Sequence, residues 1–147
     1  MKLTSPNFIN NSDLPSRYTC QGTNLNPPLI IKEVPENAQS LVLIVDDPDA
    51  PGGTWVHWTL WNLSPDTQAI PEAYRAEAPV VEGLTSFGNI GYGGPCPPSG
   101  RHRYFFKMYA LSQMIDLKSG SSSTELEAAM EGKILASAEL MSTYQKV

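Results

Sequence analysis

The sequence predicts a mainly β fold, a sandwich or a barrel, in a single domain that spans residues 1–147. Eleven glycines and thirteen prolines punctuate the 147 residues. The apolar runs between them are short, a pattern typical of strands joined by turns. The chain is long enough for one hydrophobic core, and no shift in charge or composition marks a domain boundary.

The most apolar run, LVLIV at residues 41–45, predicts a strand that is buried on both faces. It ends in the acidic segment 46–51, whose prolines cannot donate to a sheet ladder. After a turn at Gly52 and Gly53, residues 55–63 (WVHWTLWNL) predict a second central strand, because aromatic and β-branched side chains favour strands.

Side-chain alternation assigns faces to the strands. In the strand at 55–63 it places four side chains on one face: Trp55, His57, Thr59 and Trp61. Residues 101–111 predict a third long strand, and one of its faces carries three side chains: His102, Tyr104 and Phe106. The only two histidines of the chain therefore each enter a strand from the end of a loop.

The remaining predicted elements are shorter. Residues 29–31 predict a strand between two turns. Residues 123–130 predict the one clear helix, with Ser123 as N-cap and Gly132 as the stop. A final strand is expected through Ile134, because Gly132 breaks the helical run.

Two regions of the sequence are predicted to form loops. Residues 1–28 predict extended segments and turns, anchored by Phe8 and Ile9. Residues 64–100 contain little regular structure and end in a glycine- and proline-rich loop from residue 83 onward. A loop of this length inside a compact domain is usually functional.

The two cysteines, Cys20 and Cys96, favour free buried thiols over a bridge, because the chain begins without a secretory signal. Both lie in loop-like contexts. A disulfide or a redox-sensitive pair stays open as the alternative if those loops meet.

Composition excludes several classes of partner. The formal net charge is −5 and no basic run occurs, which argues against nucleic acid as a partner. No apolar segment approaches the roughly 20 residues of a membrane span. The first residues lack the apolar core of a secretory signal, so we expect a cytoplasmic location and no stable membrane insertion.

The side chains able to carry chemistry gather at the ends of the predicted strands. They are Asp46, Asp47, Asp49, His57, His102 and Tyr104. The sequence has no metal-ligand spacing, no G-x-S-x-G elbow and no phosphate-binding glycine motif, so we expect no metal, no cofactor and no catalysis. Imidazoles, a phenol and loop amides are instead donors for a small anion, and the aspartates would orient the imidazoles and favour their charged form.

Several segments together resemble the phosphatidylethanolamine-binding proteins, and in particular their prokaryotic, Raf-kinase-inhibitor-like branch. The segments are Asp47-Pro48-Asp49-Ala50-Pro51, Trp55-x-His57-Trp58, Gly94-Pro95-Cys96-Pro97-Pro98-x-Gly100-x-His102-Arg103-Tyr104, Tyr18-Thr19-Cys20-x-Gly22, Asn26-Pro27-Pro28-Leu29 and Tyr109-Ala110-Leu111. They occur in order over nearly the whole chain, which makes the resemblance specific.

The resemblance implies a β-sandwich with a large antiparallel central sheet and one or two small peripheral helices. It also implies an anion pocket at one end. Carried over residue by residue, that pocket consists of Asp47, Asp49, Pro51, His57, Pro97, Pro98, His102 and Tyr104. The Ala50–Pro51 bond is expected to be cis, and a homodimer is a further expectation. The long C-terminal helices of the eukaryotic members have no counterpart, which puts kinase regulation in doubt.

Three functions compete at this point. The first is a binding module for a phosphate-like or other anionic ligand. The second is an inhibitor or regulator of a protease or kinase that acts through the surface of residues 64–93. The third is a scaffold whose polar cluster braces loops. A separate expectation pairs Arg103 with Asp46 or another buried acid.

Overall fold

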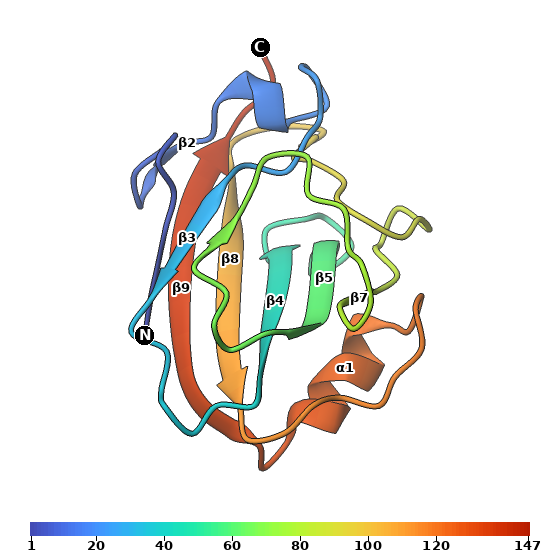
Figure 1. Ribbon diagram of the computed structural model, residues 1–147. Helices are drawn as coiled ribbons and strands as arrows, with labels where there is room; N and C mark the ends of the chain where they lie inside the picture. Colours follow the sequence, from blue (N-terminus) through green and yellow to red (C-terminus); the bar gives the residue numbers. More distant parts are fainter.

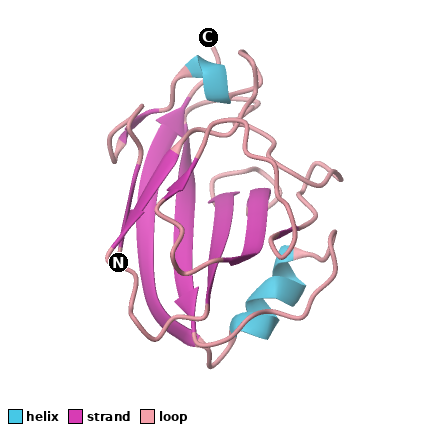
Figure 2. Cartoon of the chain, viewed as in Figure 1, coloured by secondary structure: helices cyan, strands magenta, loops and turns pink.

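The computed structural model describes all 147 residues and consists of two sheets, one α-helix and one short 3-10 helix (Figures 1 and 2). The elements in chain order are β1 (Lys2–Thr4), β2 (Ser12–Asp13), η1 (Ser16–Tyr18), β3 (Leu29–Lys32), β4 (Ser40–Asp47), β5 (Trp55–Leu63), β6 (Ala69–Ile70), β7 (Val81–Glu82), β8 (His102–Leu111), α1 (Ser123–Met130) and β9 (Ile134–Tyr144). The mainly β prediction and the strand at 55–63 are confirmed.

The large sheet has six strands in the order β2-β9-β8-β4-β5-β7, and the small sheet has the order β1-β3-β6. Every pairing is antiparallel except that of β2 with β9. The final strand is longer than the sequence suggested, because β9 pairs with β8 along almost its whole length. In the strand order of the large sheet, β4 lies between β5 and β8, at the centre.

The core has two parts, one on each face of the large sheet. Leu41, Leu43 and Val45 of β4 belong to a cluster of 18 buried residues that also includes Leu29 and Ile31 of the small sheet. The alternate β4 residues, which are Val42 and Ile44, belong to a second cluster of 7 buried residues that includes Leu126 and Met130 of α1. This confirms the prediction that β4 is buried on both faces.

α1 spans the predicted residues, Ser123–Met130, but its N-cap differs from the predicted one. Ser122, and not Ser123, is the N-cap, and it forms a reciprocal capping box with Glu125. The helix ends before Gly132, which has a φ of 74°, so the predicted stop is confirmed. No helix of the protein combines the length and the apolarity that crossing a membrane requires.

Two expectations about the loops are wrong. Phe8 is buried and packs 5.7 Å from the ring of Phe106, whereas Ile9 is 76% exposed and anchors nothing. The cis peptide bond lies at Ala78–Pro79, and the Ala50–Pro51 bond is not cis. The region 64–100 is largely irregular, as expected, with only the two-residue strands β6 and β7.

Candidate ligand-binding site

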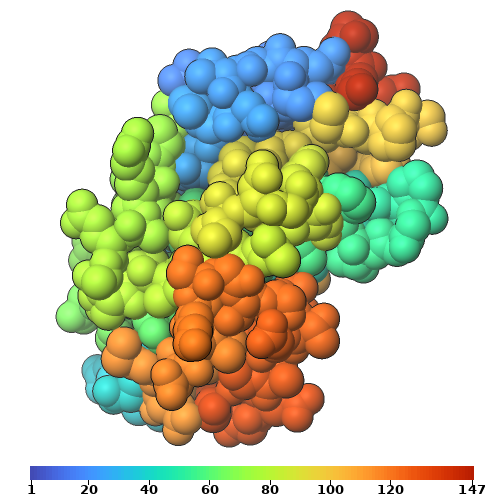
Figure 3. Space-filling view, turned by 90° about the vertical axis from the view of Figure 1, so that its right-hand side faces the viewer, coloured from blue at the N-terminus to red at the C-terminus, as the bar shows by residue number.

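A cavity of about 220 Å³ lies where the end of β4, the start of β5 and the start of β8 meet. Its lining residues are Asp47, Ala50, Pro51, Trp55, His57, Phe87, Cys96, Pro97, Pro98, His102 and Tyr104. Seven of the eight predicted site residues are therefore brought together, and Asp49 is the one that lies outside the lining. The loops of this end are packed side by side in the space-filling view, where the yellow-green segment near residue 90 touches its blue and gold neighbours (Figure 3).

A β-bulge aims His57 into this cavity. Val45 pairs with Trp58 and Asp46 pairs with Val56, so His57 is the extra residue of β5. Its ring lies 5.3 Å from the ring of Tyr104 on β8. The expectation that His57 shares a face with Trp61 is wrong, because strict alternation does not hold across the bulge.

His57 is held by the backbone of the glycine-rich loop. Its Nδ1 lies 2.6 Å from the carbonyl oxygen of Gly93, and the Gly93 amide donates to the His57 carbonyl oxygen at 3.0 Å. The side chain is only 3% exposed. Burial lowers the pKa of His57 below its ordinary value, and the Gly93 carbonyl opposes this effect only in part. The ring is therefore neutral near pH 7, contrary to the expectation of a charged imidazole.

His102 is held by a carboxylate. Its Nδ1 lies 2.7 Å from Oδ2 of Asp47, and both side chains are nearly inaccessible to solvent. The other oxygen of Asp47 accepts the backbone amide of Asp49 at 2.7 Å. One buried carboxylate thus orients the imidazole and ties down the loop that follows β4, as the sequence predicted for Asp47.

Asp49 has a different role from the predicted one. It binds Arg103 through two side-chain contacts of 2.8 and 3.0 Å and accepts the Arg103 backbone amide at 2.9 Å. These hydrogen bonds lower the pKa of Asp49 to about 2. Asp49 therefore orients Arg103 and not an imidazole. Asp46 pairs with Lys107 at 3.0 Å, so the partner of Arg103 is Asp49 and not Asp46, the first of the expected acids.

Tyr104 contributes a ring to the site. Its ring centroid lies 5.3 Å from that of His57 and 6.4 Å from that of His102, on which it is stacked. Its hydroxyl is buried without a hydrogen-bond partner, and burial raises its pKa. The phenol is therefore neutral, and its predicted role as a donor to a ligand stays a prediction.

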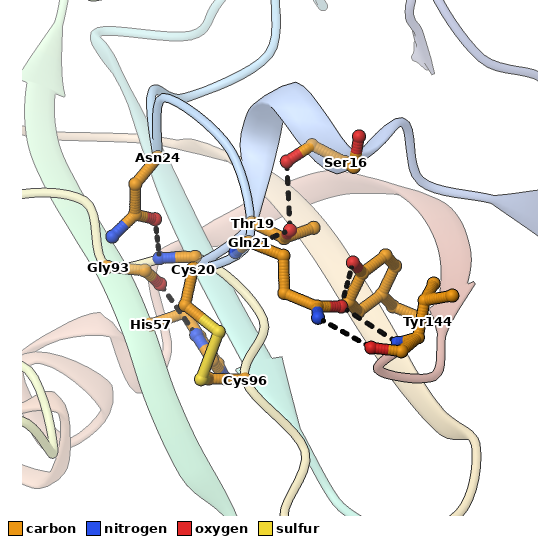
Figure 4. The surroundings of a disulfide bond; sticks show 11 residues. Ser16, Thr19, Cys20, Gln21, Asn24, His57, Gly93, Cys96 and Tyr144 are labelled. Atoms are coloured by element: carbon orange, nitrogen blue, oxygen red, sulfur yellow. Dashed lines mark hydrogen bonds between the residues drawn. A yellow bond between two sulfur atoms is a disulfide. The ribbon is translucent and has the colours of Figure 1, made fainter.

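The expectation of free thiols is wrong, because Cys20 and Cys96 form a disulfide (Figure 4). They are 76 residues apart in the sequence, with their Cα atoms 5.5 Å apart. The two loops meet because Asn24 Oδ1 accepts the Gly94 amide at 2.8 Å and the Cys20 amide donates to the Pro95 carbonyl at 3.1 Å. Figure 4 shows the disulfide directly beside the His57–Gly93 contact, so it braces one wall of the cavity.

Sequence reasoning missed four lining residues, which are Ala50, Trp55, Phe87 and Cys96. Trp55 could have been found, because it precedes His57 by two positions in the motif Trp-x-His-Trp. Phe87 had no such signal. Its ring reaches the site from the long loop and lies 5.4 Å from the Trp55 ring and 5.3 Å from the His57 ring.

The fold and the site define a small β-sandwich protein with a histidine-lined cavity at one end of its central strands. The family model described as "Phosphatidylethanolamine-binding protein" matches residues 4–145. The chain belongs to the phosphatidylethanolamine-binding protein family.

Two relatives align with 95% or more of this chain. A UPF0098 protein of Methanothermobacter thermautotrophicus is 45% identical over 150 residues, which cover 99% of each chain. A UPF0098 protein of Pyrococcus horikoshii is 47% identical over 146 residues, 95% of this chain and 74% of that protein.

Two solved structures have the same fold. A phosphatidylethanolamine-binding protein homolog from Chlamydia trachomatis has a TM-score of 0.93 at 44% identity, covering 99% of this chain and 97% of its own. YbcL of E. coli, described as a member of the mammalian family, has a TM-score of 0.92 at 31% identity, covering 99% and 98%. The similarity to YbcL agrees with the prokaryotic branch that the motifs indicated.

Proposed function

We propose that the protein is a non-catalytic module that binds a small anion, namely a phosphate or the phosphate of a headgroup, in the cavity at His57 and His102. One observation carries the proposal. Each imidazole uses Nδ1 within the protein, and each Nε2 is left without a protein partner in a ring that lines the cavity. Neither Nε2 is among the buried polar atoms that lack a partner, so both keep access to solvent.

The rim of the cavity supports a ligand with an organic part. Pro51, Trp55, Phe87 and Pro98 line the cavity with exposed apolar surface, while the imidazoles and Asp47 form its buried polar floor. A phosphate on the floor would leave an attached group against these apolar side chains. This division into a few polar groups and an apolar surround is common in small-molecule sites.

The lining supports binding without chemistry. It contains no serine, threonine or lysine, and Cys96 is engaged in the disulfide. The carboxylate of Asp47 is occupied by His102 and by the Asp49 amide. A nucleophile with an adjacent base, which covalent catalysis requires, is not built into the cavity.

Calorimetric titration with phosphoethanolamine and with inorganic phosphate at pH 6 tests the proposal. We expect saturable binding to the unmodified protein and loss of binding in His57→Ala and His102→Ala. Lys2→Ala, on the exposed end of β1, is the matched control and should bind normally. Absence of binding by the unmodified protein, or equal binding by the histidine variants, contradicts the proposal.

An inhibitor or regulator of a protease or kinase is the second candidate. It is supported by the exposed apolar side chains of the long loop, namely Leu84, Phe87 and Ile90, which are 40%, 41% and 52% exposed. Because Phe87 also lines the cavity, Ile90→Ser is the clean test. Loss of protease or kinase inhibition in this variant, with unchanged phosphate binding, would favour the second candidate.

A cytoplasmic location and a homodimer complete the proposal. Disulfides persist mainly in oxidising compartments, and both cysteines are exposed. A cytoplasmic location therefore requires that the Cys20–Cys96 bond withstand the reducing cytoplasm. Thiol alkylation in intact cells tests the location. Half-exposed Ile134 and Leu135, on the β9 segment that β2 leaves uncovered, support a dimer, which light scattering tests.

A further inference from the structure

The hydrogen-bond partners of the two imidazoles determine which ring nitrogens carry protons. The Gly93 carbonyl oxygen and the Asp47 carboxylate can only accept hydrogen bonds. Each Nδ1 must therefore carry a hydrogen that it donates. It follows that Nε2 of a neutral ring presents a lone pair to the cavity, so both histidines are acceptors there unless they are charged.

The surroundings of the two rings differ in charge. His57 faces the carbonyl groups of Gly93 and Gly94, with Asp46 and Asp47 as more distant charges. The aromatic rings of Phe87 and Tyr104 enclose it. Burial is the largest influence on His57 and lowers its pKa. A proton added to His57 Nε2 would create a buried cation with no carboxylate in direct contact.

His102 has that carboxylate. Asp47 contacts its Nδ1 directly, Asp49 lies nearby but is neutralised by Arg103, and Tyr104 stacks on the ring. Tyr144 of β9 is the cross-strand neighbour. A proton on His102 Nε2 is therefore compensated by Asp47, so His102 is the ring that can act as a cationic donor.

We propose that this pair selects an oxyacid monoanion that still carries at least one proton, such as dihydrogen phosphate or the monoanion of a phosphomonoester. One P–OH of the ligand donates to His57 Nε2, while a P–O⁻ oxygen accepts from His102 Nε2–H. The inference rests on the proposed anion site and names the ligand class of that site. Sulfate and phosphodiesters have no such proton near pH 6 and would leave the His57 acceptor facing an oxygen lone pair.

The charge of the site supports the same selection. Asp47 lies on the floor of the cavity, no lysine or arginine lines it, and the chain has a net charge of −5. One charged His102 compensates Asp47 and leaves little positive potential for a dianion. A singly charged ligand that brings its own proton avoids this repulsion.

The test is a set of calorimetric titrations at pH 6 with four probes: inorganic phosphate, phosphoethanolamine, sulfate and dimethyl phosphate. Dimethyl phosphate is a monoanion without a proton and therefore separates the effect of charge from that of the proton. We expect phosphate and phosphoethanolamine to bind at least about tenfold more tightly than the other two, because a buried acceptor left unpaired is a strong basis for discrimination. The second phosphomonoester pKa is about 6, so affinity for phosphoethanolamine should fall as the pH rises to 8.

The proton that enters the complex with the ligand can also be measured directly with the unmodified protein. Titration of phosphoethanolamine at pH 7.5 in two buffers of different ionisation enthalpy should show net proton uptake that exceeds the uptake with dimethyl phosphate. In His57→Gln the side-chain amide can donate as well as accept, so the preference for phosphate over sulfate should shrink severalfold. The buffer experiment needs no variant and stands if His57→Gln does not fold.

The possible failures are distinguishable. Equal affinity for all four probes, or tighter binding of sulfate, overturns the proton-based selection and leaves the anion site intact. No binding of any oxyanion overturns the proposed function and this inference together. Binding of ethanolamine, which has no phosphate, would also overturn both the proposed function and this inference. Its ammonium group would then donate to Nε2 of His57 and of His102.

Discussion

His102 Nδ1 lies 2.7 Å from Oδ2 of Asp47, and this buried contact joins the end of β4 to the start of β8. The two residues are 55 positions apart in the sequence. The same carboxylate also accepts the Asp49 amide, so it orients an imidazole and a loop at once. In the proposed site this contact makes His102 the donor of the pair.

Asp47→Asn should weaken phosphate binding by at least about tenfold, equivalent to about 1.4 kcal/mol. The amide keeps the size of the side chain and removes the charge that compensates a protonated His102. Calorimetry at pH 6 measures the effect. Circular dichroism serves as the control for folding. Equal affinity in the variant and in the unmodified protein would show that Asp47 is only structural.

The free energy of unfolding should fall as the pH is lowered below about 6.5, the ordinary pKa of histidine. Because the folded-state pKa of His57 is depressed, the unfolded chain binds the proton more readily, and the stability that is present above pH 6.5 is lost as the pH falls through the folded pKa. Urea unfolding at pH 7.5 and pH 5.5 measures this difference. His57→Gln should show a smaller difference than the unmodified protein, and an unchanged difference would contradict the assignment.

Lys107→Met should destabilise the protein by about 2 kcal/mol, because it leaves the carboxylate of Asp46 without its ion-pair partner. Asp46 is 5% exposed, and its Oδ1 already lacks a hydrogen bond. The matched control is Lys2→Met, which removes an exposed pair with Glu33 and should change the free energy of unfolding by less than about 0.5 kcal/mol. Equal effects of the two substitutions on urea unfolding would contradict the argument.

Reduction of the disulfide should lower both stability and ligand affinity. The bond joins cysteines 76 residues apart, for which loop closure contributes up to about 4 kcal/mol to the free energy of unfolding. The affinity should fall because Cys96 lines the cavity and precedes Pro97. Thermal unfolding and phosphate titration with and without reductant measure the two effects, and Cys20→Ala combined with Cys96→Ala should reproduce them without reductant. Unchanged phosphate binding would show that the hydrogen bonds of Asn24 and Cys20 suffice to hold the loop.

Much of the fold could be predicted from local pattern. The runs at 41–45 and 55–63 are apolar and rich in strand formers, and both form long strands of the large sheet. The helix at 123–130 was evident from its acids and from the glycine that ends it. The motifs around Asp47, His57 and His102 identified the cavity residues, because these side chains adjoin strand ends that the sequence makes visible.

The sequence by itself thus determined the β architecture and most of the side chains at the site. Tertiary structure decided how those side chains act. The bulge that turns His57, the pairing of Asp49 with Arg103 and the meeting of Cys20 with Cys96 all depend on strand register and on contacts between distant loops. A local pattern carries no information on such contacts, because the bulge depends on the register between two strands, and the partners of Asp49 and Cys20 lie more than 50 residues away.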